Sequence, residues 1–132
     1  QGLTTAQFDA LRTFVFQSAP ERLRSLGEDL VLSHGDLGYW NMVLGDAGEV
    51  GVIDFGDVAY YDRSRDFVGL TDVAVLEAAV LAYGDTPLLA EKMAIRQHML
   101  PILELPFHIG KRDTQMIDVT LDRIREVLRF WP

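Results

Sequence analysis

The sequence has no cysteine and only two lysines, Lys92 and Lys111, among its 132 residues. Without cysteine, neither a disulfide framework nor a zinc–thiolate site can form. No apolar run reaches the roughly 20 residues that a membrane-spanning helix needs, and the N-terminal residues lack the basic and then apolar pattern of a signal peptide. Because Lys and Arg are few and not clustered, nucleic-acid binding is disfavoured. These absences predict a cytoplasmic protein with no nucleic-acid or membrane partner.

What the chain does contain is typical of a folded domain. Hydrophobic residues make up 48% of the sequence and charged residues 24%, with a formal net charge of -8. That apolar fraction is too high for a disordered chain, and the length suits one hydrophobic core. We therefore expect residues 1–132 to form a single domain.

The negative charge is concentrated in one stretch of the chain. Residues 34–62 contain six acidic residues and six of the eleven glycines, and no Lys or Arg. Glycines allow tight backbone turns between the short apolar runs of this stretch. Carboxylates brought together by such turns favour a site for a hard cation that takes oxygen ligands.

The hydrophobic periodicity predicts a helix, then a few short strands, then more helices. This order is typical of an α+β fold in which most residues are helical. Thr4 and Gln7 form a capping-box pattern at the start of the first helix. The first two helices are expected over about 5–18 and from Pro20 to near Gly27, followed by a strand over 30–32 and a hairpin of 42–44 with 50–53. Three further helices are expected: one over 64–83, one from Thr86–Pro87 and one from Asp113 to Arg129. Pro101 and Pro106 should kink or break the second of these three.

One spaced motif carries the chemistry. His34-x-Asp36 is followed by Asn41, and after the hairpin comes Asp54-Phe-Gly56. Phosphoryl transfer from a nucleotide needs a carboxylate to accept the proton of the attacking hydroxyl and oxygen ligands for Mg²⁺. Asp36 and Asn41 on one loop, with Asp54 returned by the hairpin and Gly56 permitting a sharp exit, supply these groups. Taken singly, each fits an ordinary turn residue, but their combined spacing favours a site.

The segment from Ser33 to Gly69 resembles the catalytic core of the aminoglycoside phosphotransferase family. That family includes choline kinases and shares its fold with protein kinases. The resemblance implies a protein-kinase-like C-terminal lobe, mainly helical, with a small β-hairpin that carries the catalytic loop and the metal-binding aspartate. It implies transfer of the γ-phosphoryl of ATP or GTP, with Mg²⁺, to a hydroxyl or amine of a small molecule. Asp36 then resembles the catalytic base, and Asn41 and Asp54 the metal ligands.

Other positions of the motif have supporting roles under the same resemblance. His34 resembles a histidine that packs beneath the site, and Asp66 an aspartate that hydrogen-bonds the backbone of the catalytic loop. Asp57 and Asp62 add negative charge that suits a cationic acceptor. Gly35 stands where protein kinases have an arginine, and only residues 57–65 separate Gly56 from Asp66. Such a short segment favours a small-molecule acceptor over a peptide.

The sequence has no match for the nucleotide-clamping lobe of such a kinase. The 33 residues before His34 contain no lysine and only two glycines, and they are predicted to be helical. No lysine of the chain is placed to bind the nucleotide phosphates. We therefore expect the chain to be the C-terminal lobe only, inactive without an N-terminal lobe of the same protein. The alternatives are a non-catalytic binding module with the same fold and a metal-dependent hydrolase that uses Asp36 and Asp54.

Overall fold

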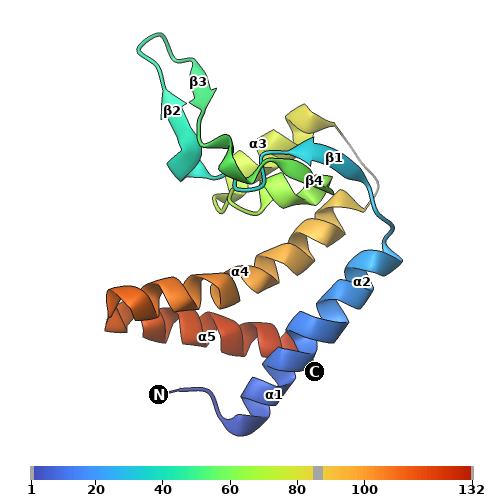
Figure 1. The fold of residues 1–132 in the computed structure, drawn as a ribbon, viewed down its shortest axis with the longest axis vertical. Helices are drawn as coiled ribbons and strands as arrows, with labels where there is room; N and C mark the ends of the chain where they lie inside the picture. The colour runs from blue at the N-terminus through green and yellow to red at the C-terminus, as the bar shows by residue number, and fades with distance from the viewer. Residues whose placement is uncertain (1, 85–87, 132) are drawn as a thin grey trace. The chain divides into compact units, whose positions relative to one another are not determined.

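The computed structural model describes residues 2–84 and 88–131, and it is α+β and mainly helical, as predicted. It contains two compact units, one of residues 28–96 and one of residues 1–27 with 97–132. The first unit holds all the strands, and the second is built from helices (Figure 1). Within the described residues, every helix is too short or too polar to cross a membrane.

Two antiparallel ribbons form the strands of residues 28–96. Strand β1 (Leu30–Ser33) pairs with β4 (Ala59–Asp62), with Leu30 opposite Asp62 and Ser33 opposite Ala59. Strand β4 was not predicted, because its side chains do not alternate between apolar and polar. Its pairing brings the residues after Asp62 beside the start of the motif loop.

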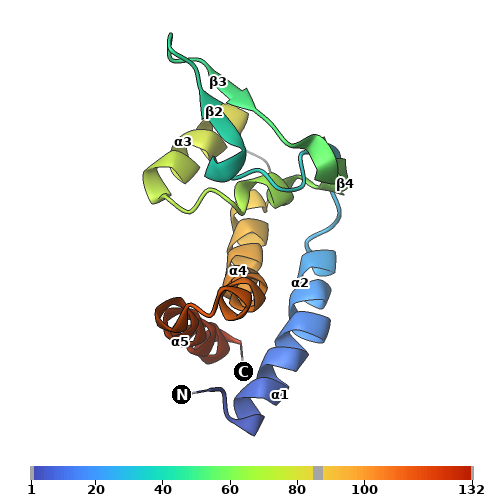
Figure 2. The same ribbon diagram turned by 60° about the vertical axis from the view of Figure 1, so that its left-hand side comes forward.

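The second ribbon is the predicted hairpin. Strands β2 (Met42–Leu44) and β3 (Val50–Val52) pair around a turn closed by a hydrogen bond of 2.8 Å from Gly45 N to Glu49 O. Gly48 has a φ of 86°, which favours glycine. The hairpin extends away from the β1–β4 ribbon (Figure 2).

The prediction of one helix over 64–83 is wrong. A 3-10 turn over Arg63–Phe67 is followed by an irregular segment, and helix α3 spans Val73–Tyr83. At this break the Gly69 backbone lies directly against Leu37, since an added Cβ atom on Gly69 would lie 2.2 Å from Leu37 O. Gly69 also forms a parallel bridge with Gly38. The following helix begins afresh, capped by the carboxylate of Asp72.

The N-terminal helices form a continuous helical segment. Helix α1 (Thr5–Thr13) passes through a π-helical stretch, Phe14–Ser18, into α2 (Ala19–Ser25). The predicted capping box is confirmed, because Thr4 and Gln7 exchange side-chain to backbone hydrogen bonds of 2.9 and 3.2 Å.

Helix α4 spans Leu89–Lys111 and contains Pro101 and Pro106. Neither proline ends the helix, although each removes one backbone donor. Pro101 is buried, so its packing offsets part of that loss. The expected start at Thr86–Pro87 lies outside the described residues.

Helix α5 (Thr114–Phe130) begins as predicted, with Asp113 accepting from Met116 N. Its buried stripe consists of Thr120, Leu121, Ile124 and Val127.

Beyond α5, the Trp131 ring lies 5.1 Å from that of Phe14. Its Nε1 donates to Nδ1 of His98 at 3.1 Å. His98 must therefore be neutral at Nδ1 for this bond to form.

The His98 contact predicts a dependence of stability on pH. Burial lowers the pKa of His98 below its usual value of 6.5, so the folded chain favours the neutral ring. This stabilisation is complete above the unfolded value and is lost as pH falls through the lower folded pKa. We expect thermal melts to show a loss of stability below about pH 6.5 that is smaller in His98→Gln. Parallel profiles for the two proteins would contradict this assignment.

Candidate active site

The motif loop starts directly after β1 and is held by one carboxylate. Asp66 accepts from the backbone N–H of His34 at Oδ2 and of Gly35 at Oδ1, both at 2.9 Å. Gly35 has a φ of 87°, and a Cβ atom there would lie 2.3 Å from Asp57 O. Glycine is therefore required at this position, and the bend turns the chain toward Asp36. Asp66 thus bonds the backbone at the start of the motif loop.

His34 links the loop to the segment that carries Asp54. Its buried ring places Nε2 at 2.9 Å from Ile53 O, and because a carbonyl can only accept, Nε2 carries the proton. Nδ1 is then an acceptor, and Asp36 N donates to it at 3.4 Å. The ring also packs on Phe55, with centroids 4.9 Å apart. His34 thus connects the backbone of Asp36 in the loop to the backbone of Ile53.

Asp36 and Asn41 are joined directly. The buried Asn41 donates from Nδ2 to the backbone O of Asp36 at 2.9 Å and to its Oδ2 at 3.1 Å. Both atoms are acceptors, so the amide orientation is settled, and Oδ1 of Asn41 lies on the other side of the group. Asn41 O accepts from Ile53 N at 3.0 Å, which closes the base of the hairpin.

Asp54 follows Ile53 in a strained conformation. Its φ of 59° and ψ of 68° are left-handed, a region that costs a non-glycine residue about 1–3 kcal/mol and is frequent at functional sites. The sharp exit that the sequence assigned to Gly56 is therefore made by Asp54 itself. Gly56 has a different role: a Cβ atom there would lie 3.3 Å from Asp54 Oδ1. The absence of a Cβ atom at Gly56 leaves room for the exposed carboxylate of Asp54.

The available oxygens suit a magnesium ion. Asn41 Oδ1 and the Asp54 carboxylate are hard donors, and Mg²⁺ typically binds one or two carboxylates together with water and substrate phosphates. In the part of the chain that the structure describes, no three His, Cys, Asp or Glu side chains cluster closely enough to hold a metal. An ion here would therefore need Asn41, Asp54 and non-protein ligands together.

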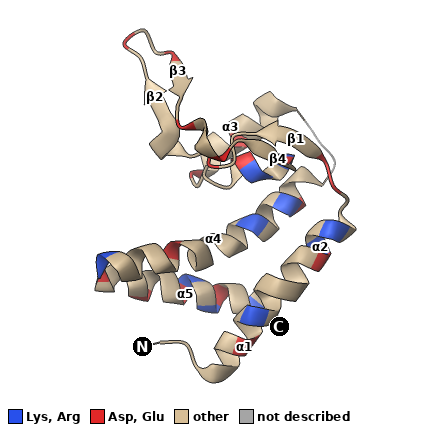
Figure 3. Cartoon of the chain, in the orientation of Figure 1, with Lys and Arg blue, Asp and Glu red and all other residues tan. Residues whose placement is uncertain are grey.

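The surroundings of these residues are acidic. Figure 3 shows acidic segments at the hairpin turn and at the exit of β3, and no basic segment on the hairpin. Asp57 lies in the 3-10 turn Phe55–Asp57 after Asp54, and its side chain is exposed. Its carboxylate is therefore accessible from solution.

Asp62 belongs to a buried charge network that the sequence did not reveal. Lys92 is only 4% exposed, and its Nζ lies 2.5 Å from Asp62 Oδ2. Asp62 Oδ1 accepts from N and Oγ of Ser64 at 3.1 and 2.7 Å, and Arg96 Nε donates to that Oγ at 2.7 Å. Burial acts to raise the pKa of Asp62, but the hydrogen bonds from Lys92 and Ser64 outweigh it and lower the pKa.

This network corrects the expectation that Asp62 attracts a cationic acceptor. Asp62 does not attract a substrate, because its carboxylate is already paired with Lys92. The same pairing removes Lys92 as a phosphate ligand. The network joins the end of β4 and the turn that carries Asp66 to helix α4. No sequence signal pointed to it, since its partners are some 30 residues apart.

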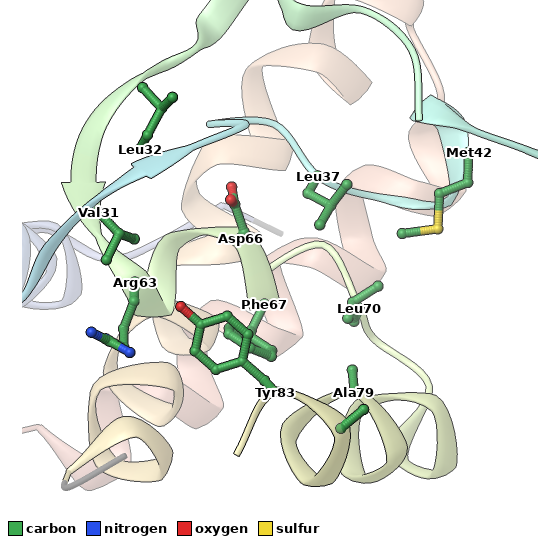
Figure 4. A pocket seen from close by; sticks show the side chains of 11 residues that line it. Val31, Leu32, Leu37, Met42, Arg63, Asp66, Phe67, Leu70, Ala79 and Tyr83 are labelled. Carbon is green, nitrogen blue, oxygen red and sulfur yellow. The ribbon is translucent and has the colours of Figure 1, made fainter. Parts of the chain in front are cut away.

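An apolar cavity of about 480 Å³ lies beneath the loop (Figure 4). The loop side chains Leu37 and Met42 point into it, toward Leu70 and Ala79. Its polar lining residues are Asp66, whose oxygens accept from the loop backbone, Arg63, which is paired with Asp29, and Tyr83. The other lining residues are apolar, and they pack beneath the loop.

The buried ion pair predicts a large effect of one substitution. Lys92→Met leaves the largely buried carboxylate of Asp62 without its cation, and breaking a buried pair costs about 3–5 kcal/mol of unfolding free energy. Urea unfolding measures the loss. Lys111→Met is the matched control at an exposed lysine and is expected to change the value by less than about 0.5 kcal/mol. Equal stability of the two variants would contradict the role of the pair.

Comparison with known proteins identifies the family and the fold. The family model described as "Phosphotransferase enzyme family" matches residues 1–95. Choline kinase LicA from Streptococcus pneumoniae has a similar structure, with a TM-score of 0.74 and 22% identity over 99% of this chain and 50% of its own. A mutant of aminoglycoside 2'-phosphotransferase-IIIa in complex with GDP gives a TM-score of 0.63 and 25% identity, over 95% of this chain and 44% of its own.

These similarities cover about half the length of each neighbour. A search of curated proteins found no match. The predicted α+β, protein-kinase-like C-terminal-lobe fold is confirmed. Because the family model covers most of the sequence, the chain belongs to the phosphotransferase enzyme family.

Proposed function

We propose that this chain is the C-terminal catalytic lobe of a small-molecule kinase. The reaction is transfer of the γ-phosphoryl of ATP or GTP to a hydroxyl or amine. The observation that carries the proposal is the pair of hydrogen bonds from Asn41 Nδ2 to Asp36. These bonds connect the proposed proton acceptor to a proposed metal ligand. Ile53, which precedes Asp54, bonds to His34 and to Asn41 and so places Asp54 beside them.

Each residue then has a defined task. Asp36 is exposed and accepts the proton of the attacking hydroxyl while holding it in line for transfer. Asn41 Oδ1 and Asp54 hold Mg²⁺, which when bound neutralises charge on the phosphates. Asp66 and His34 keep the loop in place from beneath.

The acceptor is proposed to carry positive charge. The matched neighbours are named for choline and aminoglycosides, both of which are cationic. In this chain, Asp57 is exposed, and residues 34–62 contain no Lys or Arg. An amine-bearing acceptor would be attracted by this local negative charge.

The phosphoryl donor is a separate question. The neighbour in complex with GDP makes GTP a donor to test beside ATP.

The phosphate clamp is proposed to lie outside this chain. Kinases of this fold use a lysine on the nucleotide phosphates, but Lys92 is buried on Asp62, and Lys111 lies 5.5 Å above the Phe107 ring in α4. We expect the 132 residues alone to transfer little or no phosphate. Strong ATP-dependent phosphorylation by this chain, abolished in Asp36→Ala, would disprove that expectation.

Metal binding tests the site without requiring turnover. Titration with Mg²⁺, or with Mn²⁺ followed by electron paramagnetic resonance, is expected to show weak binding that falls at least about tenfold in Asp54→Ala and in Asn41→Ala. Asp46→Ala, at an exposed carboxylate in the hairpin turn, is the matched control and should bind as the parent chain does. Identical binding by all four proteins would refute the metal assignment.

A further inference from the structure

Trp40 makes a direct contact with the proposed proton acceptor. Its indole Nε1 donates to Oδ2 of Asp36 at 3.1 Å, and the same oxygen accepts from Asn41 Nδ2 at 3.1 Å. Oδ1 of Asp36 has no hydrogen-bond partner among residues 2–84 and 88–131. Two donors on one charged oxygen restrict rotation of the carboxylate, because each bond is charge-assisted and directional.

The position of the indole depends on a glycine two residues earlier. A Cβ atom on Gly38 would lie 2.4 Å from Cζ2 and 2.6 Å from Cε2 of Trp40. These distances are shorter than any real contact, so the ring lies directly against the Gly38 backbone. Gly38 is itself fixed by its bridge to Gly69. The Gly38 backbone therefore supports the Trp40 ring, and the ring places its N–H donor at Asp36.

We propose that Trp40 is a positioning residue, whose indole N–H orients the Asp36 carboxylate and leaves Oδ1 free to accept a proton. The role of Asp36 in this inference rests on the proposed function, whereas the contact itself does not. Trp40 is 61% exposed, so core packing does not explain a tryptophan here. Its polar atom makes the specific contact, and phenylalanine would keep the ring without that atom.

Nuclear magnetic resonance of the whole chain tests the contact. The chain has two tryptophans, and Trp40→Phe assigns their two indole N–H signals. In Asp36→Ala, we expect the Trp40 signal to shift and its proton to exchange with water about fivefold faster or more, as loss of one hydrogen bond implies. Asp46→Ala is the matched carboxylate control and should leave the signal unchanged. An unchanged Trp40 signal in Asp36→Ala would overturn the proposal.

The reciprocal variants test the positioning role. Trp40→Phe removes the donor, and Gly38→Ala displaces the ring. Both are expected to shift the side-chain amide signals of Asn41, because Asp36 Oδ2 is no longer held from two sides. Circular dichroism checks that each variant is folded. Unchanged Asn41 signals in a folded Trp40→Phe would also overturn the proposal. These spectra need neither metal nor nucleotide, so their outcome is distinct from failure of the kinase proposal.

Discussion

The carboxylate of Asp66 accepts two consecutive backbone amides, those of His34 and Gly35, and the rest of the site is arranged on this contact. Both residues are buried, so their N–H groups would each lose a needed partner without it. Hydrogen bonds to a charged group contribute about 1.5–3 kcal/mol each. The contact fixes the left-handed bend at Gly35, and that bend determines where Asp36 lies.

The contact works because Asp66 is itself held. The turn that carries it follows Asp62, whose carboxylate is paired with the buried Lys92. Burying an ion pair gives little net stability compared with apolar packing, but it favours one arrangement of its partners. The proposed function needs a proton acceptor and a metal ligand at a fixed separation, and such specificity suits it. Apolar side chains such as Leu70 and Ala79 line the cavity beneath Leu37 and Met42 and pack against the same loop.

The hairpin and the motif could be predicted from the sequence, because both depend on residues that are close together along the chain. Glycines at a turn, a capping aspartate and a five-residue spacing are local signals. Strand β4 and the helix break at Gly69 were not predictable, since each depends on a partner far along the sequence, β1 for the strand and Leu37 for the glycine. The pairing of Lys92 with Asp62 was hidden for the same reason.

Within the site, the sequence placed Asp36, Asn41 and Asp54 in one motif but did not reveal how they are held. The sharp exit after the hairpin was assigned to Gly56, because glycine is the usual choice for a tight turn, whereas Asp54 adopts the left-handed conformation. The contact between Trp40 and Asp36 depends on the indole ring lying over Gly38. The order of residue types along the chain does not predict that position of the ring.

The most direct test of the account is amide hydrogen exchange at His34 and Gly35 in Asp66→Asn, measured together with Mg²⁺ affinity. Asparagine replaces one carboxylate oxygen with an NH2 group that cannot accept, so the backbone amide that faces this group loses its bond. The account predicts exchange about tenfold faster at that amide or at both, together with weaker Mg²⁺ binding, in a chain that remains folded. Protection and affinity equal to those of the parent chain would contradict the claim that Asp66 organises the site.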